Sequence, residues 1–154
     1  MISRALATAA LVLSVPASLA AADPSVTVED AWARASIGTS RPAAAYATIR
    51  NEGDVAVALA GVRAAISETA SLHESMTKDG IARMRPVPTL TIPAGGSVTL
   101  EPGGYHVMLM GLTEPLVEGR TFDATFQFAD GATLTAEVPV LSIAAKGPEG
   151  SSTR

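Results

Sequence analysis

The sequence predicts an all-β domain built as an antiparallel sandwich or barrel. Short runs of alternating or β-branched residues follow one another, separated by clusters of Gly, Pro, Asn and Asp. No window has a convincing helical stripe, although the Ala-rich residues 62–70 are ambiguous. Many short strands at regular spacing favour this architecture. The expected strands are Val26–Ala35, Ala44–Asn51, Val55–Val62, Ser71–Met76, Ile81–Val87, Ser97–Leu100, His106–Leu112, Thr121–Phe128 and Thr133–Val140.

Turn signals set the boundaries between these strands. Gly provides the positive φ that tight turns need, and Pro, Asn and Asp favour turn positions. In chain order, the signals are Asn51-Glu52-Gly53-Asp54, Asp79-Gly80, Pro93-Ala94-Gly95-Gly96, Pro102-Gly103-Gly104 and Asp130-Gly131.

The first residues predict an exported protein. Arg4 gives a weakly positive start, residues 5–15 are apolar or small, and Pro16 is followed by the small-residue run 20–22. This pattern is typical of a secretory signal peptide over residues 1–22, cleaved in the mature protein. In a bacterium the destination would be the periplasm. No later segment has the length and apolarity of a membrane span, so we expect no stable membrane insertion.

Removing 22 of the 154 residues leaves 132, enough for one domain with its own core. We place this domain at residues 23–143 and expect it to be a monomer. Residues 144–154 are polar and rich in Gly and Ser, which predicts a disordered tail. The net charge is −4 without a basic cluster, which argues against binding to nucleic acid or anionic lipid.

The chain contains no cysteine. The fold must therefore be held by its core without disulfides, although an exported protein could form them. Thiolate nucleophiles and thiolate metal ligands are excluded as well. Any soft metal ligand in this protein has to be the thioether of a methionine.

The segment GGYHVMLMGL, residues 103–112, concentrates potential metal ligands. It carries one of the two histidines and two of the five methionines. Strand alternation puts His106, Met108 and Met110 on one face and Val107 and Leu109 on the other. The segment is therefore either a core strand that contains a histidine or half of a metal site.

A second pair of potential ligands falls on a predicted hairpin. Asp79-Gly80 is a strong signal for a two-residue turn of the primed type. A two-residue loop places Ser75 opposite Met84, which makes His73 and Met84 diagonal neighbours on one face. A three-residue loop would reverse this assignment.

Both histidines and four of the five methionines lie between residues 73 and 110. Imidazole suits copper, zinc and nickel, whereas the soft thioether selects Cu(I). A His/Met set without cysteine therefore favours reduced copper. If the hairpin and the strand over residues 106–112 pack together, four such ligands converge.

The spacing of these residues resembles the signature of the periplasmic PCu(A)C copper chaperones. Ten residues separate His73 from Met84, twenty-one separate Met84 from His106, and one separates His106 from Met108. The surrounding sequences LHESMTKDGIARMRPV and GGYHVMLMGL, with AAAYATIRNEGD at residues 43–54, are also similar to that family.

The resemblance implies a cupredoxin-like antiparallel Greek-key β-sandwich that binds Cu(I) through His73, Met84, His106 and Met108. It also implies copper delivery to the binuclear copper centre of cytochrome c oxidase, whose copper-bearing subunit would be the partner, either directly or with Sco-type thiol proteins. Some relatives bind further copper with a His/Met-rich tail, and this chain's tail contains neither residue.

Several nearby residues have a simpler interpretation. Met110 is expected to fill the core, as methionines on strands usually do. Met76 should point away from His73 and is at most an auxiliary ligand. Trp32, the lone tryptophan, is expected in the sandwich core. Arg83 and Arg85 are expected on a solvated face, although they flank Met84 and could help a partner to dock.

Four other functions compete with a copper carrier. A blue-copper electron-transfer protein would need a cysteine thiolate. An enzyme would need a nucleophile motif, a specified carboxylate pair or a cofactor fingerprint, and none stands out, so we expect no catalytic activity. A structural sandwich without a metal explains the fold but not the clustered His and Met residues. A general periplasmic copper-binding or homeostasis protein remains the alternative closest to the favoured one.

Overall fold

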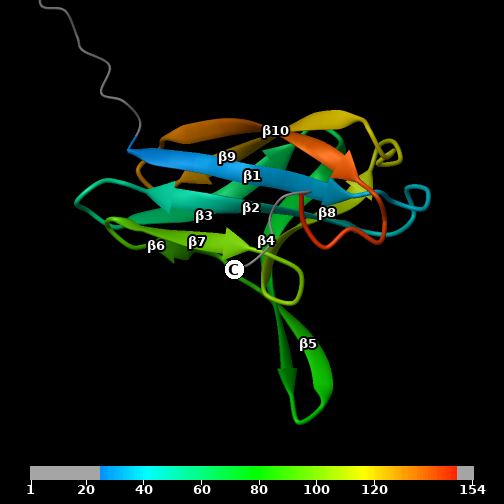
Figure 1. Cartoon of the computed structure of the whole chain (residues 1–154), viewed down its shortest axis with the longest axis horizontal. Helices are drawn as coiled ribbons and strands as arrows, with labels where there is room; N and C mark the ends of the chain where they lie inside the picture. Colours follow the sequence, from blue (N-terminus) through cyan, green and yellow to red (C-terminus); the bar gives the residue numbers. More distant parts are fainter. Residues whose placement is uncertain (1–24, 149–154) are drawn as a thin grey trace, which may run out of the picture.

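The computed structural model describes residues 25–148, so the expected signal peptide lies outside the described range. Ten strands and no helix make up this part of the chain (Figure 1). The strands are β1 (Val26–Arg34), β2 (Ala43–Asn51), β3 (Val57–Ala64), β4 (Ser67–Lys78), β5 (Ile81–Pro86), β6 (Leu90–Ile92), β7 (Gly96–Leu100), β8 (Tyr105–Leu112), β9 (Thr121–Phe128) and β10 (Thr133–Leu141). The predicted all-β class is confirmed. Within residues 25–148, no helix could cross a membrane.

The strands form one continuous path with the order β5-β4-β8-β2-β1-β10-β9-β3-β6, and β7 adds to β2. Two layers result, with β1, β2, β4, β5, β7 and β8 in one and β3, β6, β9 and β10 in the other. The layers join where β1 runs parallel to β10. This pair departs from the antiparallel prediction, because alternation along a strand specifies its buried face but not the direction of its neighbour.

Two parts of the chain differ from the expected strands. β6 was missed because it has only three residues between Pro88 and Pro93, although two of them, Leu90 and Ile92, are buried. The ambiguous residues 62–70 contain the end of β3, a turn, and the start of β4 at Ser67. Their high Ala content gave no clear period of two, and the pairing of Ser67 with Leu112 extends the strand there.

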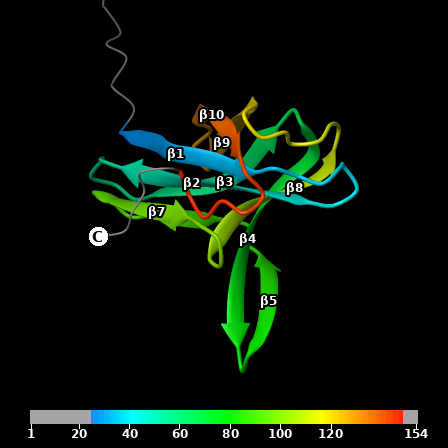
Figure 2. The same ribbon diagram turned by 45° about the vertical axis from the view of Figure 1, so that its right-hand side comes forward.

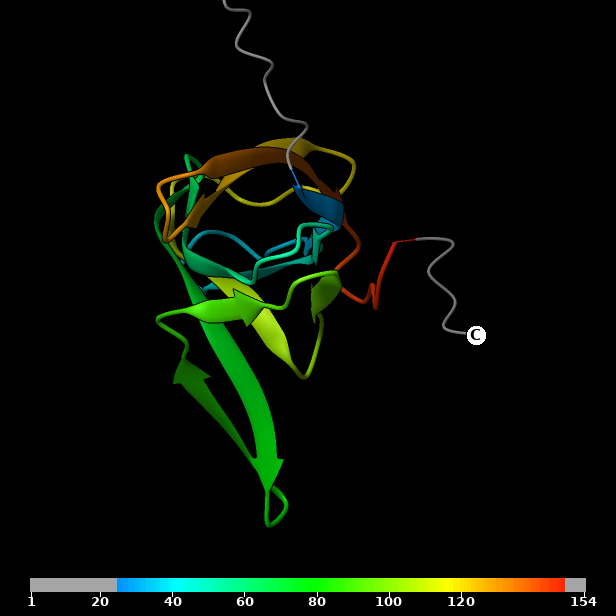
Figure 3. The same ribbon diagram turned by 90° about the vertical axis from the view of Figure 1, so that its left-hand side faces the viewer.

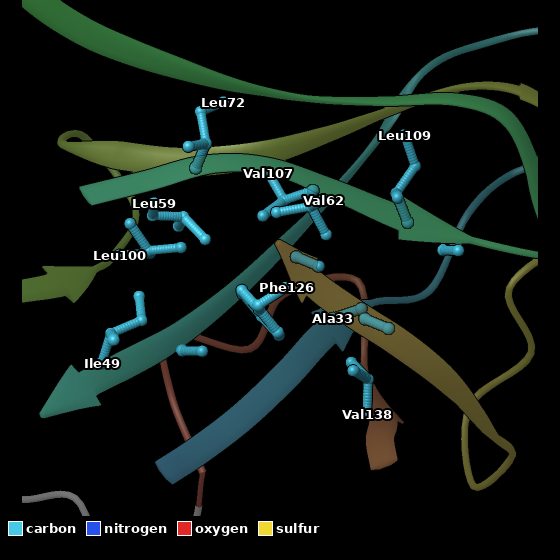
Figure 4. Close-up of a cluster of buried hydrophobic side chains, with 14 of the residues drawn as sticks. Ala33, Ile49, Leu59, Val62, Leu72, Leu100, Val107, Leu109, Phe126 and Val138 are labelled. Carbon is cyan, nitrogen blue, oxygen red and sulfur yellow. The ribbon is translucent and has the colours of Figure 1, made fainter. Parts of the chain in front are cut away.

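The core lies between the two layers (Figure 4). Ile49, Val107 and Leu109 approach it from one layer, and Leu59 and Phe126 approach it from the other. These are the alternate positions of their strands, as expected for two sheets packed face to face. The side chains on the opposite face of β8 are therefore turned away from this core.

Trp32 does not lie in the core, contrary to expectation. Its neighbour Ala33 faces the core, and Trp32 lies on the outer face opposite Tyr46, with ring centroids 4.5 Å apart. Both rings are nevertheless buried. The Arg34 guanidinium lies about 6 Å from each ring centroid, within the range of a cation–π contact.

The β4–β5 hairpin projects beyond the body of the sandwich (Figures 2 and 3). Its tip is the expected two-residue turn, with positive φ at both Asp79 (54°) and Gly80 (75°). The register pairs Lys78 with Ile81 and Ser75 with Met84, as predicted. The turn sequence therefore determines which side chains of the hairpin share a face.

Residues 144–148, the first part of the segment expected to be a disordered tail, lie within the described range. The Arg34 side chain donates a hydrogen bond from Nε to the Ala145 carbonyl at 2.8 Å. The remaining tail residues lie outside the described range.

Candidate metal centre

The pairing of β4 with β8 brings the two histidines together. His73 lies directly opposite His106 in the register. Their ring centroids are 6.0 Å apart and the ring planes are inclined by only 25°. Residues directly opposite each other share a face of the sheet. The two imidazoles therefore stand side by side, although 32 residues separate them in the sequence.

The two methionines of the predicted set fall on the same face as the histidines. Met108 lies opposite Ser71, two residues from His73 along β4. Met84 lies opposite Ser75, two residues from His73 in the other direction. Because side chains two residues apart on a strand share a face, all four candidate ligands lie on one face across β5, β4 and β8. This is the outer face, opposite the core-facing Leu72 and Val107.

The four candidate ligands differ in solvent exposure, from buried to half exposed. The His106 side chain is buried, with 5% of its surface exposed, and His73 and Met108 are partly buried. Met84 is 50% exposed on β5, whose six residues are all exposed. A metal held by these residues would be anchored on the sandwich and open towards the edge strand.

Backbone carbonyls orient the histidine rings. The Nδ1 of His106 lies 3.2 Å from the Gly104 carbonyl oxygen, and that of His73 lies 3.4 Å from the Ser71 carbonyl oxygen. A carbonyl oxygen can only accept, so Nδ1–H donates in the tautomer that makes these bonds, although the Ser71 hydroxyl, 3.5 Å from the His73 Nδ1, can also donate to that nitrogen. That tautomer leaves Nε2 of each ring with the free lone pair that a metal needs. Sequence reasoning missed Ser71 and Gly104 because any residue type supplies a carbonyl.

The donor set is soft and neutral. Within residues 25–148, no three His, Cys, Asp or Glu residues are grouped in a way that could hold a metal ion. A hard cation would need such oxygen ligands, whereas two imidazoles and two thioethers suit Cu(I). The side chains present therefore fit reduced copper and do not fit calcium or magnesium.

The two remaining methionines of this region, Met76 and Met110, are placed less favourably for binding a metal next to the histidines. Met76 lies opposite Arg83, on the other face of the hairpin from His73 and Met84, as expected. Met110 shares the ligand face but lies opposite Thr69, four residue pairs along the ladder from the pairing of His73 with His106. It is partly buried on the outer face and is absent from the core cluster, so the expectation of a core-filling residue was wrong.

Two further features lie near the candidate ligands, an ion pair and a buried tyrosine. The Arg85 Nε donates a 2.7 Å hydrogen bond to the Glu74 carboxylate, on the opposite face of the hairpin. Tyr46 lies on the ligand face of its layer, because it follows Ala45 on β2 and Ala45 pairs with the core-facing Val107. Burial raises the pKa of Tyr46, and the nearby Arg34 charge partly offsets this.

Fold and site together define a class of protein: a two-layer β-sandwich that presents an open, soft His/Met face to solvent. A family model described as "Putative lipoprotein LpqE-like" matches residues 26–140. A putative lipoprotein of Leifsonia xyli subsp. xyli (strain CTCB07) is 37% identical over 116 residues, which cover 75% of this chain and 69% of the relative. The chain therefore belongs to the LpqE-like family.

Solved structures of other proteins share the fold. The solution structure of the Cu(I) form of DR1885 from Deinococcus radiodurans is 37% identical, with a TM-score of 0.63, and the match covers 80% of this chain and 83% of that one. The copper-bound PCuAC domain of PmoF2 is 23% identical, with a TM-score of 0.65 over 77% of this chain and 93% of that domain. The similarity to the PmoF2 domain supports the cupredoxin-like fold alone.

Proposed function

We propose that this protein binds one Cu(I) ion through His73, Met84, His106 and Met108 and carries it to another protein in the periplasm. The observation that carries the proposal is the convergence of these four residues on one open face, with the histidine rings 6.0 Å apart. The 37% identical DR1885 has a structure in its Cu(I) form, which supports the choice of metal.

The graded exposure of the ligands favours a carrier over a storage site. Transfer by ligand exchange requires that an acceptor reach the ion before the carrier releases it. His106 and Met108 would retain the ion on β8, while the half-exposed Met84 could be displaced first. All four donors are neutral and make no use of a thiolate, so release requires no protonation of a bound sulfur.

The acceptor that we propose is the binuclear copper centre of the copper-bearing subunit of cytochrome c oxidase, reached directly or with a Sco-type thiol protein. The support for this acceptor is the resemblance of the His/Met spacing to the PCuAC chaperones. A general role in periplasmic copper homeostasis is the alternative. Mixing the loaded protein with the purified copper-free domain of the subunit, with and without a Sco-type protein, tests the proposed acceptor, since a homeostasis protein would retain its copper in both mixtures.

Copper binding is tested by competition for Cu(I) against a chromophoric chelator under anaerobic conditions. The wild type should bind one equivalent tightly, and a Met84→Leu/Met108→Leu variant should lose most of this affinity. A Met76→Leu/Met110→Leu variant is the matched control, because it also removes two thioethers and should bind like the wild type. Equal loss in both variants would contradict the proposed ligand set.

A further inference from the structure

The edge strand β5, which carries the candidate metal ligand Met84, leaves one side of the sheet open. β5 lies at the end of the strand order, pairs with β4 alone among the strands of residues 25–148, and is exposed along its whole length. An edge strand presents unpaired backbone donors and acceptors that another chain can use to add a strand.

The hydrogen-bond pattern of the hairpin shows which residues point to this open edge. The Val87 amide donates to the Leu72 carbonyl at 2.9 Å, while the Ser75 amide donates away from β5, to Gly104 at 3.0 Å. Bonded and non-bonded pairs alternate along an antiparallel ladder. Arg83 and Arg85 therefore bond to β4, and the backbone N–H and C=O of Ala82 and Met84 point outward.

Side-chain positions and charge restrict what could pair with this edge. Met84 lies on the ligand face, whereas Arg83 and Arg85 lie on the opposite face. β5 contains no acidic residue, although the whole chain has a net charge of −4. The two ion pairs found within residues 25–148 are Arg50–Glu29 and Arg85–Glu74, so Arg83 takes part in neither.

We propose that the copper-accepting partner docks by adding an extended strand of the pattern acid–Met–acid to the edge of β5, an inference that rests on the proposed function. The partner's methionine would face Met84 on the ligand side, and the flanking carboxylates would face Arg83 and Arg85 on the other. Cross-strand pairs of opposite charge stabilise such a register.

The same register explains how the Cu(I) ion could be transferred from this protein to its partner. Directly opposite residues of a hydrogen-bonded pair have Cα atoms about 5.5 Å apart, which lets two thioethers reach one ion. The Cu(I)–S bond to Met84 breaks as the Cu(I)–S bond to the partner's methionine forms. Both donors are neutral, the copper remains Cu(I), and no proton moves.

A second copy of this chain is a less suitable occupant of the edge. Pairing of β5 with itself would bring the arginines of the two copies together, and like charges on paired strands are destabilising. Pro86 also lacks a backbone donor, which limits the available edge to the few residues after the turn. A short docking strand gives a small and transient interface, as a carrier requires.

The test is an NMR titration of the metal-free mature protein with the peptide Thr-Val-Glu-Met-Glu-Val-Thr. We expect saturable shifts confined to β4 and β5 and slower hydrogen exchange at the Ala82 amide. The peptide Thr-Val-Lys-Met-Lys-Val-Thr should bind at least roughly tenfold more weakly. Absence of saturation by the Glu peptide at ~1 mM, or shifts centred on another strand, would overturn the proposal.

Variants separate edge pairing from other contacts. Ala82→Pro removes the outward N–H without removing a bond to β4 and should weaken Glu-peptide binding roughly tenfold or more. Ala82→Val retains the N–H and should bind as the wild type does. Undiminished binding to Ala82→Pro would exclude edge pairing. If Ala82→Pro does not fold, Arg83→Glu decides, since it should reverse the preference between the Glu and Lys peptides.

A separate Cu(I) competition assay distinguishes this proposal from the proposed function. Ala82 is not a candidate ligand, so a folded Ala82→Pro variant should retain wild-type Cu(I) affinity. Failure of the wild type to bind Cu(I) would remove the proposed function, whereas the peptide titration uses metal-free protein and still reports on the docking edge.

Discussion

His73 and His106 occupy directly opposite positions on β4 and β8, and their ring centroids are 6.0 Å apart with the ring planes inclined by 25°. Each ring has its Nδ1 beside a carbonyl oxygen of its own strand segment, which leaves both Nε2 atoms available. We predict that His73→Ala and His106→Ala each lower Cu(I) affinity at least roughly tenfold, about 1.4 kcal/mol. Chelator competition measures both. A Met76→Leu variant, changed on the other face of the hairpin, should bind like the wild type, and a single histidine variant of unchanged affinity would exclude that residue.

The two histidines also predict how Cu(I) binding depends on pH. A protonated imidazole cannot ligate a metal, whereas a thioether takes up no proton near neutral pH. On acidification the affinity should therefore fall, with a limiting slope of about two decades per pH unit if both rings bind. A His106→Met variant should retain a soft donor with a limiting slope of about one decade. A flat profile in the wild type would remove both histidines from the site.

The hairpin half of the candidate site could be predicted from the sequence, because the arrangement of its residues follows from local rules. Asp79-Gly80 fixes a two-residue turn, the turn fixes the register, and the register puts Met84 and His73 on one face. The pairing of His73 with His106 could not be predicted, because a strand pattern does not identify its neighbour. Alternation also cannot choose between Met108 and Met110, which share a face.

The errors in the fold have similar causes. Trp32 was expected in the core because it is large and apolar, but it is buried on the outer face with Tyr46. Strand alternation allows either face, and hydrophobicity alone favoured the wrong one. The parallel contact of β1 with β10 joins strands near the two ends of the domain, so no turn sequence specifies its direction.

Asn51 is predicted to be essential for stability. It is fully buried, and its amide nitrogen lies 2.8 Å from the Val55 carbonyl oxygen and 3.2 Å from that of Pro93, while its Oδ1 accepts from the Gly53 amide at 3.0 Å. These bonds tie the end of β2 to two loops. Asn51→Ala leaves several buried groups without partners and should lower the free energy of unfolding by about 2–4 kcal/mol.

Urea denaturation measures this loss. Thr125→Ala is the control, because it also deletes a hydrogen-bonding side chain, but one that is partly buried and shares a solvent-exposed bond with Thr135. That change should remain within about 0.5 kcal/mol of the wild type. If the two variants were equally stable, the Asn51 hydrogen bonds would not hold the loops.

Tyr46 should make the protein sensitive to alkaline pH. Burial raises its pKa above the ordinary value of 10.0, despite the opposing Arg34 charge. In the unfolded chain the phenol therefore loses its proton at a lower pH than in the folded protein. The folded state binds more protons in this range, so the contribution of Tyr46 to stability is complete below about pH 10 and is lost as the pH rises through the folded pKa.

Tyr46→Phe removes this titration and retains the ring that packs against Trp32 at an interplanar angle of 32°. Between about pH 9 and pH 11, the denaturation midpoint of the wild type should therefore fall more steeply than that of Tyr46→Phe. Other groups titrate in both proteins, so the difference between the two curves isolates the Tyr46 phenol. Parallel curves for the wild type and Tyr46→Phe would show that burial of the Tyr46 hydroxyl does not control alkaline stability.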